Sequence, residues 1–182
     1  MESGLAEIRR ALQFDRVSIL NRATLGWCLY FAGRYDEAID ELNQTIELDS
    51  NLHFPHWFLG RVFWQKKMFA EAIENLQQAL SLSNGDIPVQ AELIAARAMA
   101  GEREEARRLL DELQTSSTQK YVSPYYLALI HLALGDDEKT LDLLEAAYDE
   151  RAGQLFWLNV EPRFNRLRYH PRFSDLLRRL GH

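Results

Sequence analysis

The segment Tyr35-Asp-Glu-Ala-Ile-Asp-Glu-Leu decides the fold, because Phe69-Ala-Glu-Ala-Ile-Glu-Asn-Leu repeats it further along the chain. The two copies begin 34 residues apart, so Ala38 of the first aligns with Ala72 of the second. The same step taken from Ala72 leads to Ala106 and then to Thr140. Four residues after this aligned position every copy has a leucine, and these are Leu42, Leu76, Leu110 and Leu144. A pattern that keeps its phase over four copies predicts a repeat protein.

Each copy predicts two helices joined by a tight turn. In the first copy, Leu25 and Leu29 mark the apolar face of one helix, and Ala38 and Leu42 mark that of the next. Gly33 falls between the two helices, where a residue without a β-carbon can adopt the left-handed conformation that ends a helix. One such hairpin cannot bury its apolar face alone, so we expect successive hairpins to stack into a solenoid.

The repeating unit resembles the tetratricopeptide repeat, whose pattern is W-x2-L-G-x2-Y, then A-x3-F, a second Ala and a Pro. The second copy is the closest match, with Leu59, Gly60, Phe63, Ala72 and Leu76 at the positions of that pattern. The third copy is degenerate. The resemblance implies an all-α, right-handed α-solenoid of about four helix-turn-helix repeats plus a half repeat, ended by a C-terminal capping helix.

The repeat step also predicts how the chain is organised. The expected parts are the second helix of a preceding, truncated repeat over 1–18, repeats over 19–52, 53–86, 87–120 and 121–152, and a C-terminal capping segment over 153–182. The first part is expected to be a second helix because a backward step of 34 residues aligns Ile8 with Leu42. In the capping segment, Pro162 and Pro171 are expected to break one or two amphipathic helices.

The C-terminal part carries a second resemblance. The sequences Val160-Glu-Pro-Arg-Phe and His170-Pro-Arg-Phe are similar to the end of many large bacterial tetratricopeptide proteins. In those proteins the repeats follow an effector, such as a winged-helix DNA-binding domain, a protein kinase or a nucleotide cyclase. The resemblance implies that this chain is the regulatory C-terminal region of a larger bacterial protein, and it does not identify the effector.

Composition excludes several classes of protein. The net charge of −6 argues against direct nucleic-acid binding, which needs a basic surface. The single cysteine, Cys28, cannot form an internal disulfide and is expected to be a small buried hydrophobe. No apolar stretch approaches the roughly eighteen residues of a membrane span, so no membrane insertion is expected. We expect a cytoplasmic location, or a periplasmic one if the parent protein has an upstream transmembrane segment.

Motifs of catalysis are missing from the sequence. It contains no G-x-S-x-G, no phosphate-binding glycine loop and no dinucleotide fingerprint, so the chain is predicted not to be an enzyme and to need no cofactor. His53 and His56 have no evident third ligand, so no metal site is predicted. What remains for function is a surface.

The family resemblance implies where that surface lies. In tetratricopeptide proteins the first helices of the repeats line a concave groove, and copying those positions onto this chain predicts partner-binding residues. They are Trp27, Tyr30, Phe54, Trp57, Arg61, Trp64 and Tyr125. Trp and Tyr are typical binding hot spots, and Arg61 could grip a carboxylate. We therefore expect a protein–protein interaction scaffold that binds an extended or helical partner segment in an aromatic groove.

Other interpretations stay open at this point. The aromatic side chains could hold a small ligand in a sensory domain, they could form a homodimer interface, or they could be ordinary core residues. The carboxylate clamp by which one subgroup of the family binds chaperones is not expected here. The corresponding positions hold Ala23, Trp27, Phe58, Pro88 and Glu92.

Overall fold

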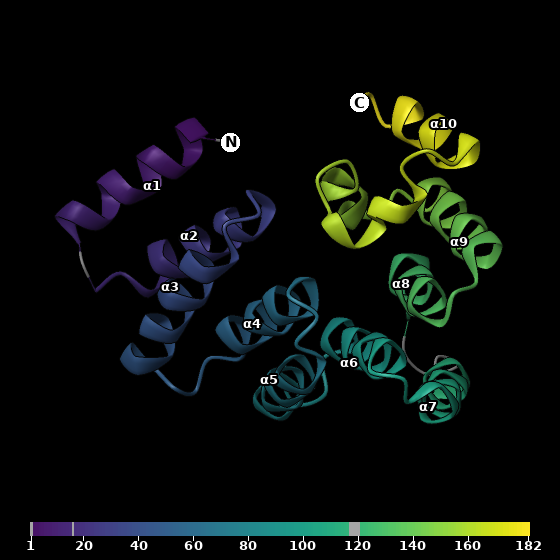
Figure 1. The fold of residues 1–182 in the computed structure, drawn as a ribbon, viewed down its shortest axis with the longest axis horizontal. Helices are drawn as coiled ribbons and strands as arrows, with labels where there is room; N and C mark the ends of the chain where they lie inside the picture. Colours follow the sequence, from purple (N-terminus) through teal and green to yellow (C-terminus); the bar gives the residue numbers. More distant parts are fainter. Residues whose placement is uncertain (1, 16, 117–120) are drawn as a thin grey trace. The chain divides into compact units, whose positions relative to one another are not determined.

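The structure is a computed structural model that describes residues 2–15, 17–116 and 121–182, and every regular element within them is a helix (Figure 1). The chain divides into two compact units, Met1–Val89 and Gln90–His182, and each unit is described by itself. The predicted all-α fold is therefore confirmed for the described residues.

The N-terminal unit is a stack of helical hairpins. Its helices are α1 (Glu2–Phe14), α2 (Ile19–Phe31), α3 (Tyr35–Leu48), α4 (His53–Gln65) and α5 (Phe69–Leu82). Helix α2 packs against α3 and α4 against α5, while α1 packs on α2 and both α2 and α3 contact α4 (Figure 1). Leu5, Leu25, Leu42 and Val62 are fully buried between these helices, so stacking completes the core that one hairpin lacks.

The C-terminal unit continues the helical pattern and ends in a different one. Its elements are most of α6 (Ile87–Met99), α7 (Arg103–Ser116), α8 (Pro124–Leu134), α9 (Asp137–Asp149), the short 3-10 helices η1 (Gly153–Trp157) and η2 (Pro162–Leu167), and α10 (Pro171–Arg179). Helix α8 packs against α9, and α10 packs against α9. The predicted end of the third repeat, residues 117–120, lies outside the described residues.

Left-handed residues end the first helix of each hairpin. Gly33, Gly101 and Gly135 have φ angles of 72°, 94° and 84°, as expected for the glycine register of the repeat. In the second copy Lys67 stands at this position and has the same conformation, with φ of 59°. The backbone geometry of the repeat is therefore retained where the glycine is not.

A second glycine position of the repeat, occupied by Gly26 and Gly60, allows the two helices of a hairpin to approach closely. A β-carbon at Gly60 of α4 would lie 2.5 Å from Cγ of Leu76 on α5, well inside van der Waals contact. Gly26 of α2 has the same relation to Leu42 of α3, at 2.7 Å. The leucine of the second helix thus packs directly on the backbone of the first.

This close approach predicts opposite effects for one substitution at two sites. Gly60→Ala is expected to lower the free energy of unfolding by about 1–3 kcal/mol, because the added methyl group overpacks the contact with Leu76. Gly4→Ala in α1 meets no atom within 4 Å and should raise stability by about 0.5–1 kcal/mol, since alanine favours helix. Urea denaturation of both variants checks the pair, and equal effects would contradict the packing described.

The capping segment contains a short duplicated motif. Glu161-Pro-Arg-Phe begins η2, and His170-Pro-Arg-Phe begins α10 nine residues later. In both copies the proline occupies the first helical turn, and the side chain before it accepts a hydrogen bond from the backbone N–H of the arginine. The helices of the capping segment are divided at Pro162 and Pro171, as expected. Each proline also starts the next helix, because proline lacks only an N–H that the first turn leaves unbonded anyway.

The arginines of the two copies of this motif lie in different environments. Arg163 is buried and binds Glu161 through Nε and Nη2, at 2.8 and 2.9 Å, and Oε2 of Glu92 on α6 through Nη1, at 3.1 Å. Arg172 lies at the surface and binds acidic side chains of α9, namely Glu138, Asp142 and Glu145. The two phenylalanines, Phe164 and Phe173, stack with their ring centroids 6.2 Å apart and are fully buried.

Candidate partner-binding site

An apolar hollow of about 290 Å³ opens between α2 and α4 of the N-terminal unit. We call it the α2–α4 hollow, and its lining residues are Leu20, Ala23, Thr24, Trp27, Phe54 and Phe58. Leu20 stands at its edge with 74% of its surface exposed. These side chains come together because α2 and α4 are the first helices of consecutive hairpins, which the repeat places side by side.

Aromatic contacts support the inner wall of the hollow. Trp27 of α2 meets Phe58 of α4 edge to face, with ring centroids 4.6 Å apart. Phe58 also contacts Phe54, one turn earlier on α4, at 6.4 Å, and stacks with Trp57 at 5.9 Å. Such pairs fix ring orientations beyond simple burial, so the hollow has a preformed shape.

Arg61 lies behind these rings. Its guanidinium carbon is 4.5 Å from the ring centroid of Trp57 and 5.7 Å from that of Trp27, distances at which a cation is attracted to an aromatic face. Only 8% of Arg61 is exposed. The guanidinium therefore packs against the aromatic wall of the hollow, and the structure does not present it to a partner carboxylate as the sequence predicted.

The structure separates the residues that the sequence predicted for the site. Trp27 and Phe54 line the hollow, and the half-buried Trp57 packs behind it on Phe58. Tyr30 and Trp64 are 3% and 7% exposed and belong to the core. Tyr125 is 4% exposed, belongs to the C-terminal unit and packs on Phe164, with centroids 5.8 Å apart. These three rings offer almost no surface to a partner, so we leave them out of the site.

Several lining residues are absent from the predicted list. Leu20 and Ala23 hold groove positions of the family pattern but are left out of that list, and Thr24 and Phe58 are not selected, yet these four form most of the hollow. A signal existed for Phe58, because it follows Phe54 by one helical turn and so shares its face.

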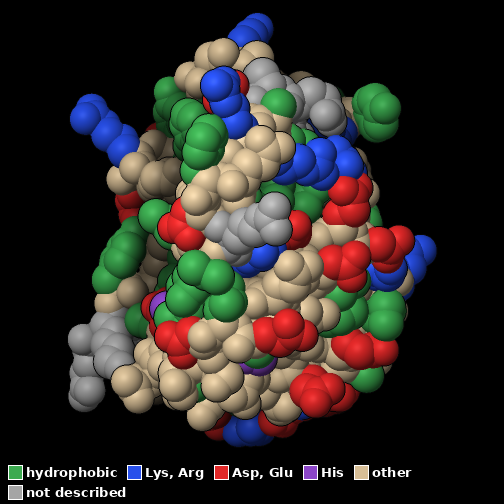
Figure 2. Space-filling model, turned by 90° about the vertical axis from the view of Figure 1, so that its left-hand side faces the viewer, with side chains coloured by type: hydrophobic (Ala, Val, Ile, Leu, Met, Phe, Trp, Pro, Cys, Tyr) green, Lys and Arg blue, Asp and Glu red, His purple; other side chains and the backbone are tan. Residues whose placement is uncertain are grey.

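Charge is distributed unequally between the first and second helices of this unit. Helices α2 and α4 contain no Asp or Glu, whereas α3 and α5 carry Asp36, Glu37, Asp40, Glu41, Glu47, Glu71 and Glu74. In the view from the α1 side, hydrophobic side chains reach the surface in separate patches between charged ones (Figure 2). The wall of the hollow thus contributes no carboxylate that would repel an acidic partner.

Burial shifts the pKa of two described side chains, those of Cys28 and His131. Burial raises the pKa of the Cys28 thiol, which keeps it protonated at neutral pH. Burial also lowers the pKa of His131, against the opposing effect of Asp136, so the imidazole is neutral. Within the described ranges, no three His, Cys, Asp or Glu side chains are grouped so that they could hold a metal ion. Nor does any helix there have the length and apolar character to cross a membrane.

Stacked helical hairpins with close glycine–leucine contacts define this molecule as a helical repeat protein. Models of the tetratricopeptide repeat match residues 24–51 and 63–130, which together make up more than half of the chain. The chain belongs to the tetratricopeptide-repeat family. No curated protein matches its sequence closely enough to count as a relative.

Solved structures of tetratricopeptide proteins show the same fold. A thermophilic protein of Thermus thermophilus has a TM-score of 0.67, at 16% identity over 97% of this chain and 90% of that one. YrrB, described as having an unusual peptide-binding site, has a TM-score of 0.57, at 14% identity over 93% and 88% of the two chains. MamA also has a TM-score of 0.57, at 16% identity over 83% and 88%.

Proposed function

We propose that the chain is a protein–protein interaction scaffold that binds a segment of a partner protein at the α2–α4 hollow. The observation that carries the proposal is an apolar hollow with a preformed aromatic wall and the exposed Leu20 at its edge. Exposed apolar surface of this kind marks interaction sites in soluble proteins. Peptide binding by YrrB, a protein of the same fold, supports the proposal.

The size of the hollow favours one kind of occupant. Pockets for small molecules have volumes of roughly 300–1,000 Å³, and this hollow of about 290 Å³ falls just below that range. It suits a single bulky apolar side chain, presented by an extended or helical segment that continues across the surface of α2 and α4. This occupant accounts for the hollow better than a small ligand.

Selection of peptides tests the proposal without a known partner. Peptides from a random display library are selected on the full chain, and their affinities for two variants are then measured. Leu20→Arg places a charge at the edge of the hollow and is expected to weaken binding by about tenfold or more, because anchors in apolar pockets dominate binding energy. Leu48→Arg, at a 42% exposed leucine of α3, is the control and should bind as the natural chain does.

Two outcomes would contradict the proposal. One is that no peptide is enriched, and the other is that Leu20→Arg and Leu48→Arg bind the selected peptides equally well. Light scattering over a range of protein concentrations addresses homodimerisation, which stays a prediction. The role as the regulatory region of a larger bacterial protein also stays a prediction, because no comparison bears on it.

A further inference from the structure

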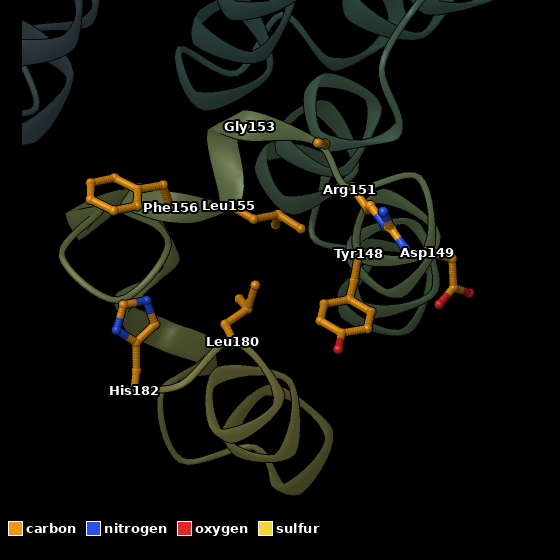
Figure 3. A pocket seen from close by; sticks show the side chains of 9 residues that line it. Tyr148, Asp149, Arg151, Gly153, Leu155, Phe156, Leu180 and His182 are labelled. Atoms are coloured by element: carbon orange, nitrogen blue, oxygen red, sulfur yellow. The ribbon is translucent and has the colours of Figure 1, made fainter.

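The C-terminal unit contains a second cavity, of about 610 Å³, which lies in the range of small-molecule sites. Tyr148 of α9, Leu155 of η1 and Leu180, which follows α10, point toward a common space (Figure 3). Phe156 and His182 stand at another side of this space (Figure 3). The cavity is thus framed by the end of α9 and the capping segment, and not by the first helices of the repeats.

The apolar part of the cavity includes an unusually exposed ring. Phe156 is 70% exposed and is held edge to face against Trp157, with ring centroids 4.9 Å apart. A large aromatic side chain kept outside the core and oriented by its neighbour is suited to contact with a bound molecule. Together with Tyr148, Leu155 and Leu180, it can enclose an apolar body.

Arg151 contributes a cationic side chain to the lining of the cavity. It ends α9 in the left-handed conformation, with φ of 56°, and its N–H donates to the carbonyl of Tyr148 at 2.9 Å. Lys67 adopts the same conformation, so the turn itself assigns no role to the side chain. What distinguishes Arg151 is that its side chain lines the cavity.

The carboxylate side chain that lines the cavity has a cation beside it. This carboxylate, that of Asp149, lies 3.7 Å from Arg179, whose guanidinium stacks 4.1 Å from the ring centroid of Tyr148. Within the described part of the chain, Arg151 has no carboxylate partner, and its charge is available to a ligand.

We propose that this cavity binds a small organic anion with an apolar body. The apolar body lies among Tyr148, Leu155, Phe156 and Leu180, and the anionic group pairs with Arg151. This site is separate from the partner-binding surface proposed above, so either proposal can fail while the other stands.

A matched pair of fluorescent probes tests the proposal on the full chain. 8-Anilinonaphthalene-1-sulfonate is an aromatic anion, and N-phenyl-1-naphthylamine has the same rings without the sulfonate. The anion is expected to bind one site about tenfold more tightly than the neutral probe, the effect of one charge-assisted contact. Equal affinities for the two probes would overturn the proposal.

Variants locate the site and its charge. Arg151→Asn removes the cation and tolerates the left-handed turn, so it should reduce affinity for the sulfonate to that for the neutral probe, whereas Arg151→Lys should retain most of it. Gly153→Leu has room for its side chain, since a β-carbon there meets no atom within 4 Å, and should block both probes without lowering the melting temperature. The proposal is overturned if Arg151→Asn leaves sulfonate binding intact. It is also overturned if binding is lost in Leu20→Arg instead of Gly153→Leu.

Discussion

Replacement of Arg163 by methionine is expected to lower the free energy of unfolding by about 3–5 kcal/mol. The guanidinium of Arg163 is the common partner of Glu92 and Glu161, and the side chains of all three residues are at most 2% exposed. Removal of the cation takes from two interior carboxylates the counter-charge that they share. Chemical denaturation near neutral pH measures the loss.

Removal of one of the two carboxylates identifies the cause of this loss. Adding Glu92→Gln to Arg163→Met should restore part of the stability. Arg172→Met, in the partly exposed copy of the same motif, should cost less, about 1 kcal/mol, because solvent screens ion pairs that it reaches. Similar losses at both arginines, with no recovery on adding Glu92→Gln, would show that burial of the charge is not the cause.

Phe164→Ala is expected to lower the free energy of unfolding by about 3–5 kcal/mol as well, through the cavity it leaves. Phe164 is fully buried, 5.8 Å from the ring of Tyr125 on α8 and 6.2 Å from that of Phe173 on α10. Its ring therefore connects the capping segment to the last hairpin. Calorimetry of the variant measures the effect as a lower melting temperature.

The same substitution at an exposed phenylalanine of the capping segment is the control for Phe164→Ala. Phe156 is 70% exposed, so Phe156→Ala should change the free energy of unfolding by only about 0.5 kcal/mol or less. If the two alanine variants unfolded alike, the capping segment would not be docked as described.

Much of the fold follows from short-range rules that can be read in the sequence. The 34-residue step predicted helical hairpins because apolar spacing and helix-ending glycines depend on residues within a few turns of each other. The capping segment was harder to predict. Proline both ends and begins helices, and at Pro162 and Pro171 the preceding Glu161 and His170 act as N-caps. The partner of Arg163 on α6 is distant in sequence, so no local pattern indicates it.

The candidate site could be predicted only in part for a related reason. Family positions mark the face of a helix, but exposure depends on what covers that face. Trp57 and Trp64 stand two turns apart on α4, yet the first is half-buried and the second is in the core. Leucine is not a typical binding hot spot, so the sequence alone does not single out Leu20. It becomes a candidate because it lines a hollow whose other wall is formed by α4.

Methyl NMR of the chain, with and without a peptide selected on it, tests most directly whether partners bind at the α2–α4 hollow. We expect the largest chemical-shift changes at the methyl groups of Leu20 and Ala23, which line the hollow. The methyl groups of Leu48 on α3 should remain unchanged. Changes concentrated at Leu48, or at Leu155 and Leu180 of the C-terminal unit, with none at Leu20 and Ala23, would contradict the account.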